Sequence, residues 1–230
     1  MVRPGAALVL LLGGFASTPF AAAGELEIGV YGGANESVGS RGVLDSGTAS
    51  EAYAIDWQGR SFSAPIYYGL RLTYWPDWME NWGIGLDFTH AKAYADLSDP
   101  ALAADFSVLE FTDGLNLLTL NGYRKWDLDD RLRAYLGAGV GVNIPHVEIT
   151  TGAGTVVGET STFEYQLAGP AAQILAGVSY EVLPNLRLFG EYKLSYARVN
   201  ADLAGSGGSF STDIASHHIL AGLSYAFDGP

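Results

Sequence analysis

Apolar and polar residues alternate along most of this chain with a period of two. The last such segment, Ile219 to Phe227, places large apolar side chains on one face and small or polar ones on the other. A period of two is typical of a β-strand, in which successive side chains point to opposite faces. If the apolar face of this strand contacts lipid, Ile219, Leu223, Tyr225 and Phe227 face the membrane.

Eight segments carry this alternation. We expect strands over residues 25–33, 66–75, 82 to about 94, 112–126, 131 to about 147, 166–182, 187 to about 199, and 219–227. Short turns at residues 76–77, 127–130 and 184–185 join three pairs of strands, and the other four connections are long and polar. This spacing predicts an all-β fold, an eight-stranded antiparallel transmembrane β-barrel with three short periplasmic turns and four longer extracellular loops, over residues 24–230. A soluble sandwich or lipocalin-like barrel, which would bury its apolar face, is the competing interpretation.

Residues 1–23 have the pattern of a cleaved signal peptide. A basic start is followed by an apolar run from Ala6 to Phe15 and by three alanines before Gly24. The apolar run is shorter than the roughly 20 residues that a membrane-spanning helix needs. We expect export and a mature chain that begins at Gly24, located in the outer membrane of a Gram-negative bacterium.

The composition fits a barrel and limits the classes of partner that the chain is expected to bind. The chain has 30 Gly, 13 Tyr and 10 Phe, which suit twisted strands with aromatic girdles, and it has no Cys, which excludes disulfide bonds and thiol chemistry. Its formal net charge of −13 argues against nucleic acid as a partner, because cations dominate binding to phosphates. We expect a monomer that contacts the lipids of the outer membrane, lipopolysaccharide among them.

The interior of an eight-stranded barrel is just wide enough for side chains to fill, so transport through it is not expected. The alternation turns five charged residues inward: Glu27, Arg71, Asp87, Glu191 and Lys193. Because an isolated buried charge is costly, we expect these five residues to form a paired polar core. Function is then expected at the extracellular rim and in the loops.

Ionisable and polar residues gather where the predicted strands reach that rim. They are His90 and Lys92, then Glu110, Asp113 and Asn116, then His146 and Glu148, then Glu164 and Gln166, and finally Asp213 and His218. Of the adjacent pair His217 and His218, at most one can face inward.

An imidazole beside carboxylates can hold a divalent metal or perform acid-base chemistry. We take His146 and Glu148, two residues apart on one strand face, as candidate metal ligands, and Glu110, Asp113 and Glu164 as candidate catalytic groups. We expect these residues to meet at the extracellular mouth. No spaced metal motif, nucleophile elbow or phosphate-binding glycine loop supports this chemistry, so the alternative is a set of solvated, loop-pinning groups.

Eight stretches at these strand ends carry a resemblance. They are WQGRSF (57–62), PIYYGLR (65–71), WGIGLDFTHAKAYAD (82–96), LEFTDGLNLLTLN (109–121), NIPHVEI (143–149), TFEYQLAGPA (162–171), FGEYKLSY (189–196) and STDI (211–214). In these stretches the chain resembles the lipid A oxidase family of alphaproteobacterial outer-membrane proteins.

The resemblance implies an O2-dependent oxidation of the proximal glucosamine of lipid A to 2-aminogluconate, with hydrogen peroxide as by-product. Direct reaction of O2 with a sugar is spin-forbidden, and the chain has neither a flavin motif nor Cys. A divalent redox metal held by His146, Glu148 and neighbouring carboxylates is therefore the cofactor that we consider.

Two other functions remain open. One is a non-catalytic structural or surface-binding barrel like outer-membrane protein A. The other is a lipid A deacylase, which would need a Ser and a His, such as Ser195 and His90, on one lipid-accessible patch.

Overall fold

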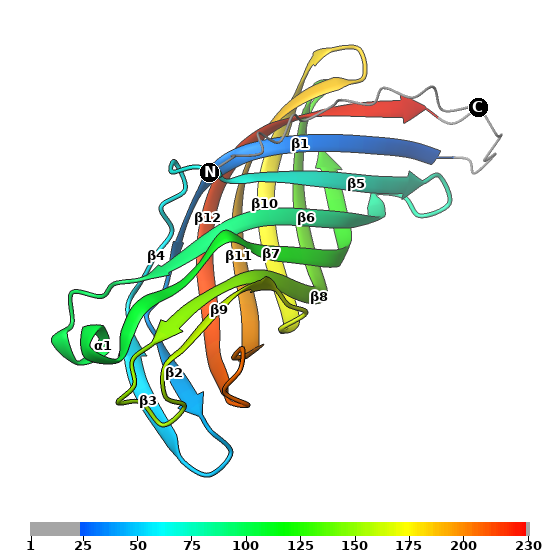
Figure 1. The fold of residues 1–230 in the computed structure, drawn as a ribbon. Helices are drawn as coiled ribbons and strands as arrows, with labels where there is room; N and C mark the ends of the chain where they lie inside the picture. The colour runs from blue at the N-terminus through cyan, green and yellow to red at the C-terminus, as the bar shows by residue number, and fades with distance from the viewer. Residues whose placement is uncertain (1–23, 229–230) are drawn as a thin grey trace, which may run out of the picture.

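The computed structural model of the chain describes residues 24–228, so the predicted signal peptide, residues 1–23, lies outside the described residues. Eight long antiparallel strands form a ring (Figure 1). They are β1 (Gly24–Ser37), β5 (Tyr68–Pro76), β6 (Trp82–Ala95), β7 (Phe106–Asp127), β8 (Leu132–Thr151), β10 (Gly169–Leu183), β11 (Leu186–Asp202) and β12 (Ser209–Asp228). Because β1 pairs with β12, the ring is closed, and the predicted fold class is confirmed.

The three short connections lie where the sequence predicts them, between β5 and β6, β7 and β8, and β10 and β11. The long connections contain more regular structure than expected: β2 (Ser40–Asp45), β3 (Ser50–Ile55), β4 (Trp57–Gln58), α1 (Pro100–Asp105) and β9 (Thr160–Tyr165). Two strands extend into the predicted long connections, since β7 begins at Phe106 and not near residue 112, and β12 begins at Ser209 and not at residue 219. Within residues 24–228, no helix is long and apolar enough to cross a membrane.

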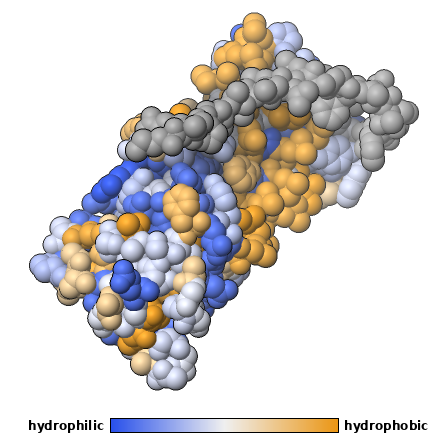
Figure 2. Space-filling model, viewed as in Figure 1, coloured by the Kyte–Doolittle hydropathy of each residue, from blue (hydrophilic) through white to orange (hydrophobic). Residues whose placement is uncertain are grey.

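The outer wall is apolar at the end of the barrel where β1 begins and β12 ends. Ile219 is 73% exposed and Leu223, Tyr225 and Phe227 are also exposed, whereas Leu220 between them is 3% exposed. The predicted register of β12 is therefore confirmed. Figure 2 shows this apolar surface covering the half of the molecule that holds the periplasmic turns, while the opposite half is mostly polar.

We call the apolar outward surface of the eight strands the belt. Aromatic side chains mark its periplasmic border, at Trp82, Trp126 and Phe227, and tyrosines lie toward its extracellular border, at Tyr68 and Tyr196. Such aromatic girdles are typical of outer-membrane barrels, in which the belt contacts lipid. Strand residues beyond the belt lie outside the membrane-spanning part.

The interior changes character along the barrel axis. Beyond the belt, the inward side chains form an apolar core that includes Leu44, Phe106, Phe111, Val147 and Phe210. Inside the belt, the inward side chains combine buried charged residues with two small clusters of mostly aromatic residues, one around Tyr31 and Phe189 and one around Trp75 and Tyr123. Water surrounds the first part and lipid the second, so each part buries the residues that its surroundings do not favour. This apolar extracellular core explains why the strands continue beyond their predicted ends.

Four of the five predicted inward charges form one network. Arg71 contacts Asp87 and Glu191 at 2.6 Å each, and Lys193 Nζ lies 3.3 Å from Asp87 Oδ2. Tyr31 donates a hydrogen bond to Asp87, and its hydroxyl accepts one from Lys193. The predicted paired core is confirmed for these four residues. Glu27 accepts a hydrogen bond from Trp75 Nε1 and makes no ion pair among the described residues.

Leu223→Arg should impair membrane insertion of the barrel. Near the bilayer midplane an outward Arg costs about 2–4 kcal/mol, and near the interfaces about 0–1 kcal/mol. The matched control is Phe227→Arg, at the periplasmic border of the same strand face. Unfolding in lipid vesicles should show the larger loss of stability for Leu223→Arg. Equal losses would contradict the placement of the belt.

Lys193→Met should destabilise the barrel more than the double change Glu191→Gln with Lys193→Met. The four network residues carry two positive and two negative charges. Removing one partner leaves an uncompensated buried charge, which costs about 3–5 kcal/mol, whereas the double change leaves the Arg71–Asp87 pair neutral. Urea unfolding of both variants measures the difference. Equal stability of the two would show that charge balance does not govern the lumen.

Candidate functional site

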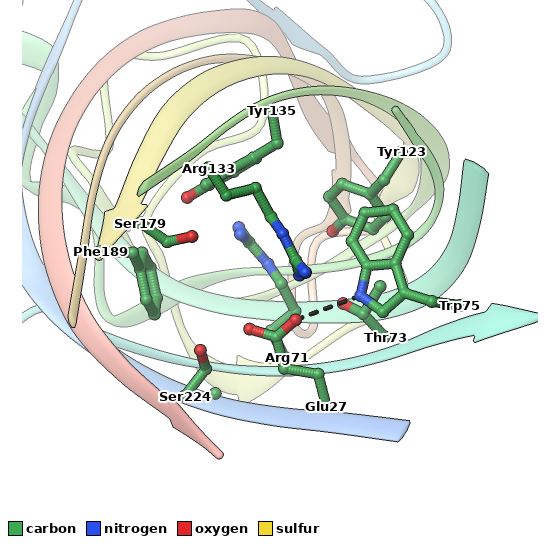
Figure 3. A pocket seen from close by; sticks show the side chains of 11 residues that line it. Glu27, Arg71, Thr73, Trp75, Tyr123, Arg133, Tyr135, Ser179, Phe189 and Ser224 are labelled. Atoms are coloured by element: carbon green, nitrogen blue, oxygen red, sulfur yellow. Dashed lines mark hydrogen bonds between the residues drawn. The ribbon is translucent and has the colours of Figure 1, made fainter. Parts of the chain in front are cut away.

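The lumen offers little room for a substrate. Figure 3 shows Arg71 and Arg133 reaching into a small cavity beside Tyr123 and Trp75. The cavity measures about 30 Å³, which suits water molecules, not a sugar. The hydroxyl oxygens of Tyr123 and Ser224 are buried with no hydrogen-bond partner in the described structure, and ordered water is the natural partner for such groups.

The predicted metal ligands lie on the outer wall and not in the mouth of the barrel. On β8, Val147 is fully buried in the apolar core. Its neighbours His146 and Glu148 therefore point to the opposite face, away from the lumen. This corrects the expectation that the candidate residues meet at the extracellular mouth.

His146, Glu148 and Asp113 come together there. His146 Nδ1 lies 2.9 Å from Glu148 Oε1 and 3.9 Å from Asp113 Oδ2. One ligand atom from each of the three residues lies within 4.8 Å of the others. Thr112 Oγ1 donates a hydrogen bond of 2.5 Å to the same Glu148 oxygen, which fixes that carboxylate.

Two aromatic residues of β9 hold His146 in place. Its ring makes edge contacts with Phe163 and Tyr165, at centroid distances of 4.4 and 4.6 Å. The Tyr165 hydroxyl also donates a hydrogen bond to the Asp113 backbone oxygen. Sequence reasoning missed both aromatic residues, because β9 lies in a segment that was expected to be loop.

Glu110 and Lys92 extend the site along β7 and β6. Glu110 lies directly opposite Glu148 in the β7–β8 ladder. Burial and the neighbouring Glu148 raise the pKa of Glu110. The Lys92 side chain is fully covered, and its Nζ donates a 2.7 Å hydrogen bond to the Ser63 backbone oxygen. Burial lowers the pKa of Lys92 against the opposing effect of three nearby carboxylates.

His90 is a second imidazole at this site. Its Nδ1 lies 2.9 Å from Asn116 Oδ1, while Asn116 Nδ2 donates a hydrogen bond to the Ile144 oxygen. The amide orientation thus makes His90 Nδ1 the donor and leaves Nε2 an acceptor, and Nε2 has no partner. The ring stacks on Tyr68 at 4.8 Å. Gly114, at φ +122°, allows this approach, because a β-carbon there would collide with His90 Nδ1 and Asn116 Oδ1.

We call His90, Lys92, Glu110, Asp113, His146 and Glu148 the outer-wall cluster. It lies directly beyond the belt, since His90 is the next outward residue after Phe88 on β6. Exposed apolar side chains accompany it in the neighbouring segments, including Phe62 at 84% and Ile66 at 59% exposure. The cluster therefore lies at the extracellular border of the belt.

The remaining predicted rim residues lie apart from this cluster. Glu164 is paired with Val147 across the β8–β9 ladder, so its side chain is on the face opposite to His146. The expected convergence of Glu164 with the other candidates is therefore wrong. Glu164 accepts a hydrogen bond from Gln166, and Asp213 accepts one from Tyr196.

The deacylase interpretation is contradicted by the same alternation. Ser195 and His218 are buried in the lumen and share a 2.7 Å hydrogen bond. His90 is on the outer wall, so Ser195 and His90 are on opposite faces of the sheet. His217 faces outward and bonds to Tyr192, which confirms that at most one of the two adjacent histidines faces inward.

The donor set of the cluster fits a divalent metal of borderline hardness. One imidazole and two carboxylates, His146, Asp113 and Glu148, supply the nitrogen and oxygen ligands that Fe, Mn or Zn accept. A bound metal at Nδ1 would replace the hydrogen bond that now links His146 to Glu148. Without a metal, His146 and Glu148 remain joined by this hydrogen bond.

No protein-family model matches the chain, and no curated protein matches it. Solved structures do. The outer membrane protein OprG of Pseudomonas aeruginosa is 14% identical with a TM-score of 0.50, over 90% of this chain and 97% of OprG. Neisserial surface protein A is 15% identical with a TM-score of 0.48, over 89% and 97% of the two chains. The outer membrane protease OmpT of Escherichia coli is 11% identical with a TM-score of 0.40, over 92% and 99%.

At such identities, the likeness to OprG shows a shared outer-membrane β-barrel fold. Nothing in these comparisons names a lipid A oxidase. That resemblance stays a prediction.

Glu110→Gln should flatten the dependence of stability on pH. A carboxyl whose pKa is raised by folding binds more protons in the folded state, so the free energy of unfolding falls as pH rises from about 4.5 through the raised pKa. The glutamine variant removes this fall. Urea unfolding midpoints between pH 4 and pH 8 measure it, and identical slopes for both proteins would contradict the assignment.

Proposed function

We propose that the chain is an outer-membrane barrel whose outer-wall cluster oxidises the proximal glucosamine of lipid A, as its resemblance to the lipid A oxidase family implies. The observation that supports this proposal is the position of the outer-wall cluster. Two imidazoles, one lysine and three carboxylates lie on the outer wall, directly above the belt. A lipid head group reaches that height while its acyl chains stay against the belt. A cluster inside the lumen would have no such access.

The reaction has a simple balance. Two electrons and two protons leave C1 of the sugar and its hydroxyl, O2 takes up both to form hydrogen peroxide, and water opens the resulting lactone to 2-aminogluconate. Asp113, His146 and Glu148 would hold a divalent metal, which supplies the redox chemistry that side chains lack.

The other residues of the cluster have roles that follow from their surroundings. His90 Nε2 is a buried acceptor without a partner, and it takes the hydroxyl proton once the sugar displaces the side chains that cover it. Lys92 is covered and offsets the negative charges of Glu110, Asp113 and Glu148 from inside the wall. Thr112 keeps Glu148 oriented toward His146.

A second candidate is a non-catalytic surface barrel. The β2–β3 hairpin favours it, because this hairpin extends the sheet from β12 beyond the membrane and could contact other molecules. This function requires the filled lumen and the hairpin, but not the outer-wall cluster.

Mass spectrometry of lipid A from cells with and without the chain should distinguish the two candidates. The oxidase adds one oxygen atom to the proximal unit. We expect His146→Ala or removal of metals with a chelator to abolish this gain, because either change removes the metal site. Asp213→Asn, a change on a distant outward residue of β12, should leave the gain intact.

Oxidation that persists after both chelation and His146→Ala would eliminate the metal site. If the wild type oxidises nothing with Fe, Mn or Cu supplied, the chain is a surface barrel.

A further inference from the structure

A groove crosses the belt on the outer wall, at the periplasmic end and far from the outer-wall cluster. It measures about 500 Å³ and is formed by β7, β8, β10 and β11, with Trp82 of β6 at its border. Gly122 and Ala138 face each other across the β7–β8 ladder at its floor, while Leu136, Ile174 and Tyr192 rise around them. A β-carbon added at Gly122 would meet no atom within 4 Å. The groove is therefore open space above a glycine.

The chemistry around the groove indicates which kind of ligand it binds. The groove lies within the belt, which contacts the hydrocarbon of the bilayer, so its apolar wall fits an acyl chain. A second apolar groove, of about 530 Å³, shares Ala138 and Ile174 with the first and continues along the wall toward Tyr196. Together the two grooves form a path for an extended acyl chain from the periplasmic border of the belt toward its extracellular side.

Arg124 lies at the periplasmic end of the groove. Its guanidinium carbon is 5.0 Å from the centre of the Trp82 ring and 5.3 Å from that of Trp126. Within residues 24–228, no carboxylate forms an ion pair with it, although the chain has a net charge of −13. A guanidinium in an interfacial aromatic girdle, without a carboxylate partner, is suited to bind a phosphate through two parallel hydrogen bonds.

We propose that this groove binds one glycerophospholipid of the periplasmic leaflet, with the phosphate on Arg124 and an acyl chain over Gly122 and Ala138. The positive charge of Arg124 at one end of the groove indicates the phosphate, and the apolar wall along the rest of the groove indicates the acyl chain. The site is independent of the proposed oxidase activity, since it shares no residue with the outer-wall cluster and lies at the opposite border of the membrane.

The test is native mass spectrometry of the purified barrel in detergent, titrated with dioleoyl phosphatidylglycerol. The wild type should retain one lipid per chain. Its affinity for this lipid should be at least tenfold higher than that of Gly122→Leu, which fills the groove, and than that of Arg124→Gln, which removes the partner of the phosphate. Gly190→Leu is the matched control, since Gly190 is a glycine of the outer wall that also has open space above it and does not line the groove.

Dioleoylglycerol, which has no phosphate, should bind wild type and Arg124→Gln equally. Heat-modifiable migration in gels establishes that each variant is folded before titration. Equal retention of phosphatidylglycerol by wild type and Gly122→Leu would overturn the proposal and leave only non-specific lipid around the belt. A wild-type dimer that Gly122→Leu dissociates would overturn it too, because a second copy would then occupy the groove.

Discussion

The absence of water in the bilayer is the constraint on which this structure depends. Every backbone amide inside the belt needs a partner within the protein, and only a closed ladder supplies partners for strands. The pairing of β1 with β12, from Glu25 opposite Asp228 to Ser37 opposite Ser216, provides that closure. The closed ring separates an outer face, which is apolar in the belt, from an interior that holds the Arg71–Asp87–Glu191–Lys193 network beside small clusters of mostly aromatic residues.

Closure with eight strands also decides where chemistry can occur. The lumen is filled by the charge network within the belt and by an apolar core beyond it, so neither part admits a substrate. The outer wall is the surface that remains, and its two borders differ. The extracellular border carries the outer-wall cluster around His146 and Glu148, whereas the periplasmic border carries Arg124 above an open groove. Both places lie on the outer face at a border of the belt, which connects the two proposals to one geometry.

Alternation along the sequence predicts the strands, the three short turns, the lipid-facing residues of β12 and the inward position of Arg71 and Lys193, because each depends on local periodicity. The same periodicity also predicts the face on which His146 lies. Leu136, Ala138 and Val140 point outward, and the even-numbered residues of β8 continue to point outward as far as His146 and Glu148. The expectation of a site at the mouth ignored this continuation. The position of Glu164, the bulge at Gly114 and the aromatic contacts from β9 depend on long-range pairing, which a single sequence does not reveal.

The central claim is that the cluster faces lipid head groups on the outer wall. Because the chain has no Cys, single-cysteine variants can carry a fluorescent label at one position without a background. The most direct measurement is quenching of a label at position 113, in the cluster, and at position 164, on the opposite sheet face, by lipids with a spin label on the head group. The account predicts strong quenching at position 113 and weak quenching at position 164. Equal quenching, or the reverse order, would contradict it.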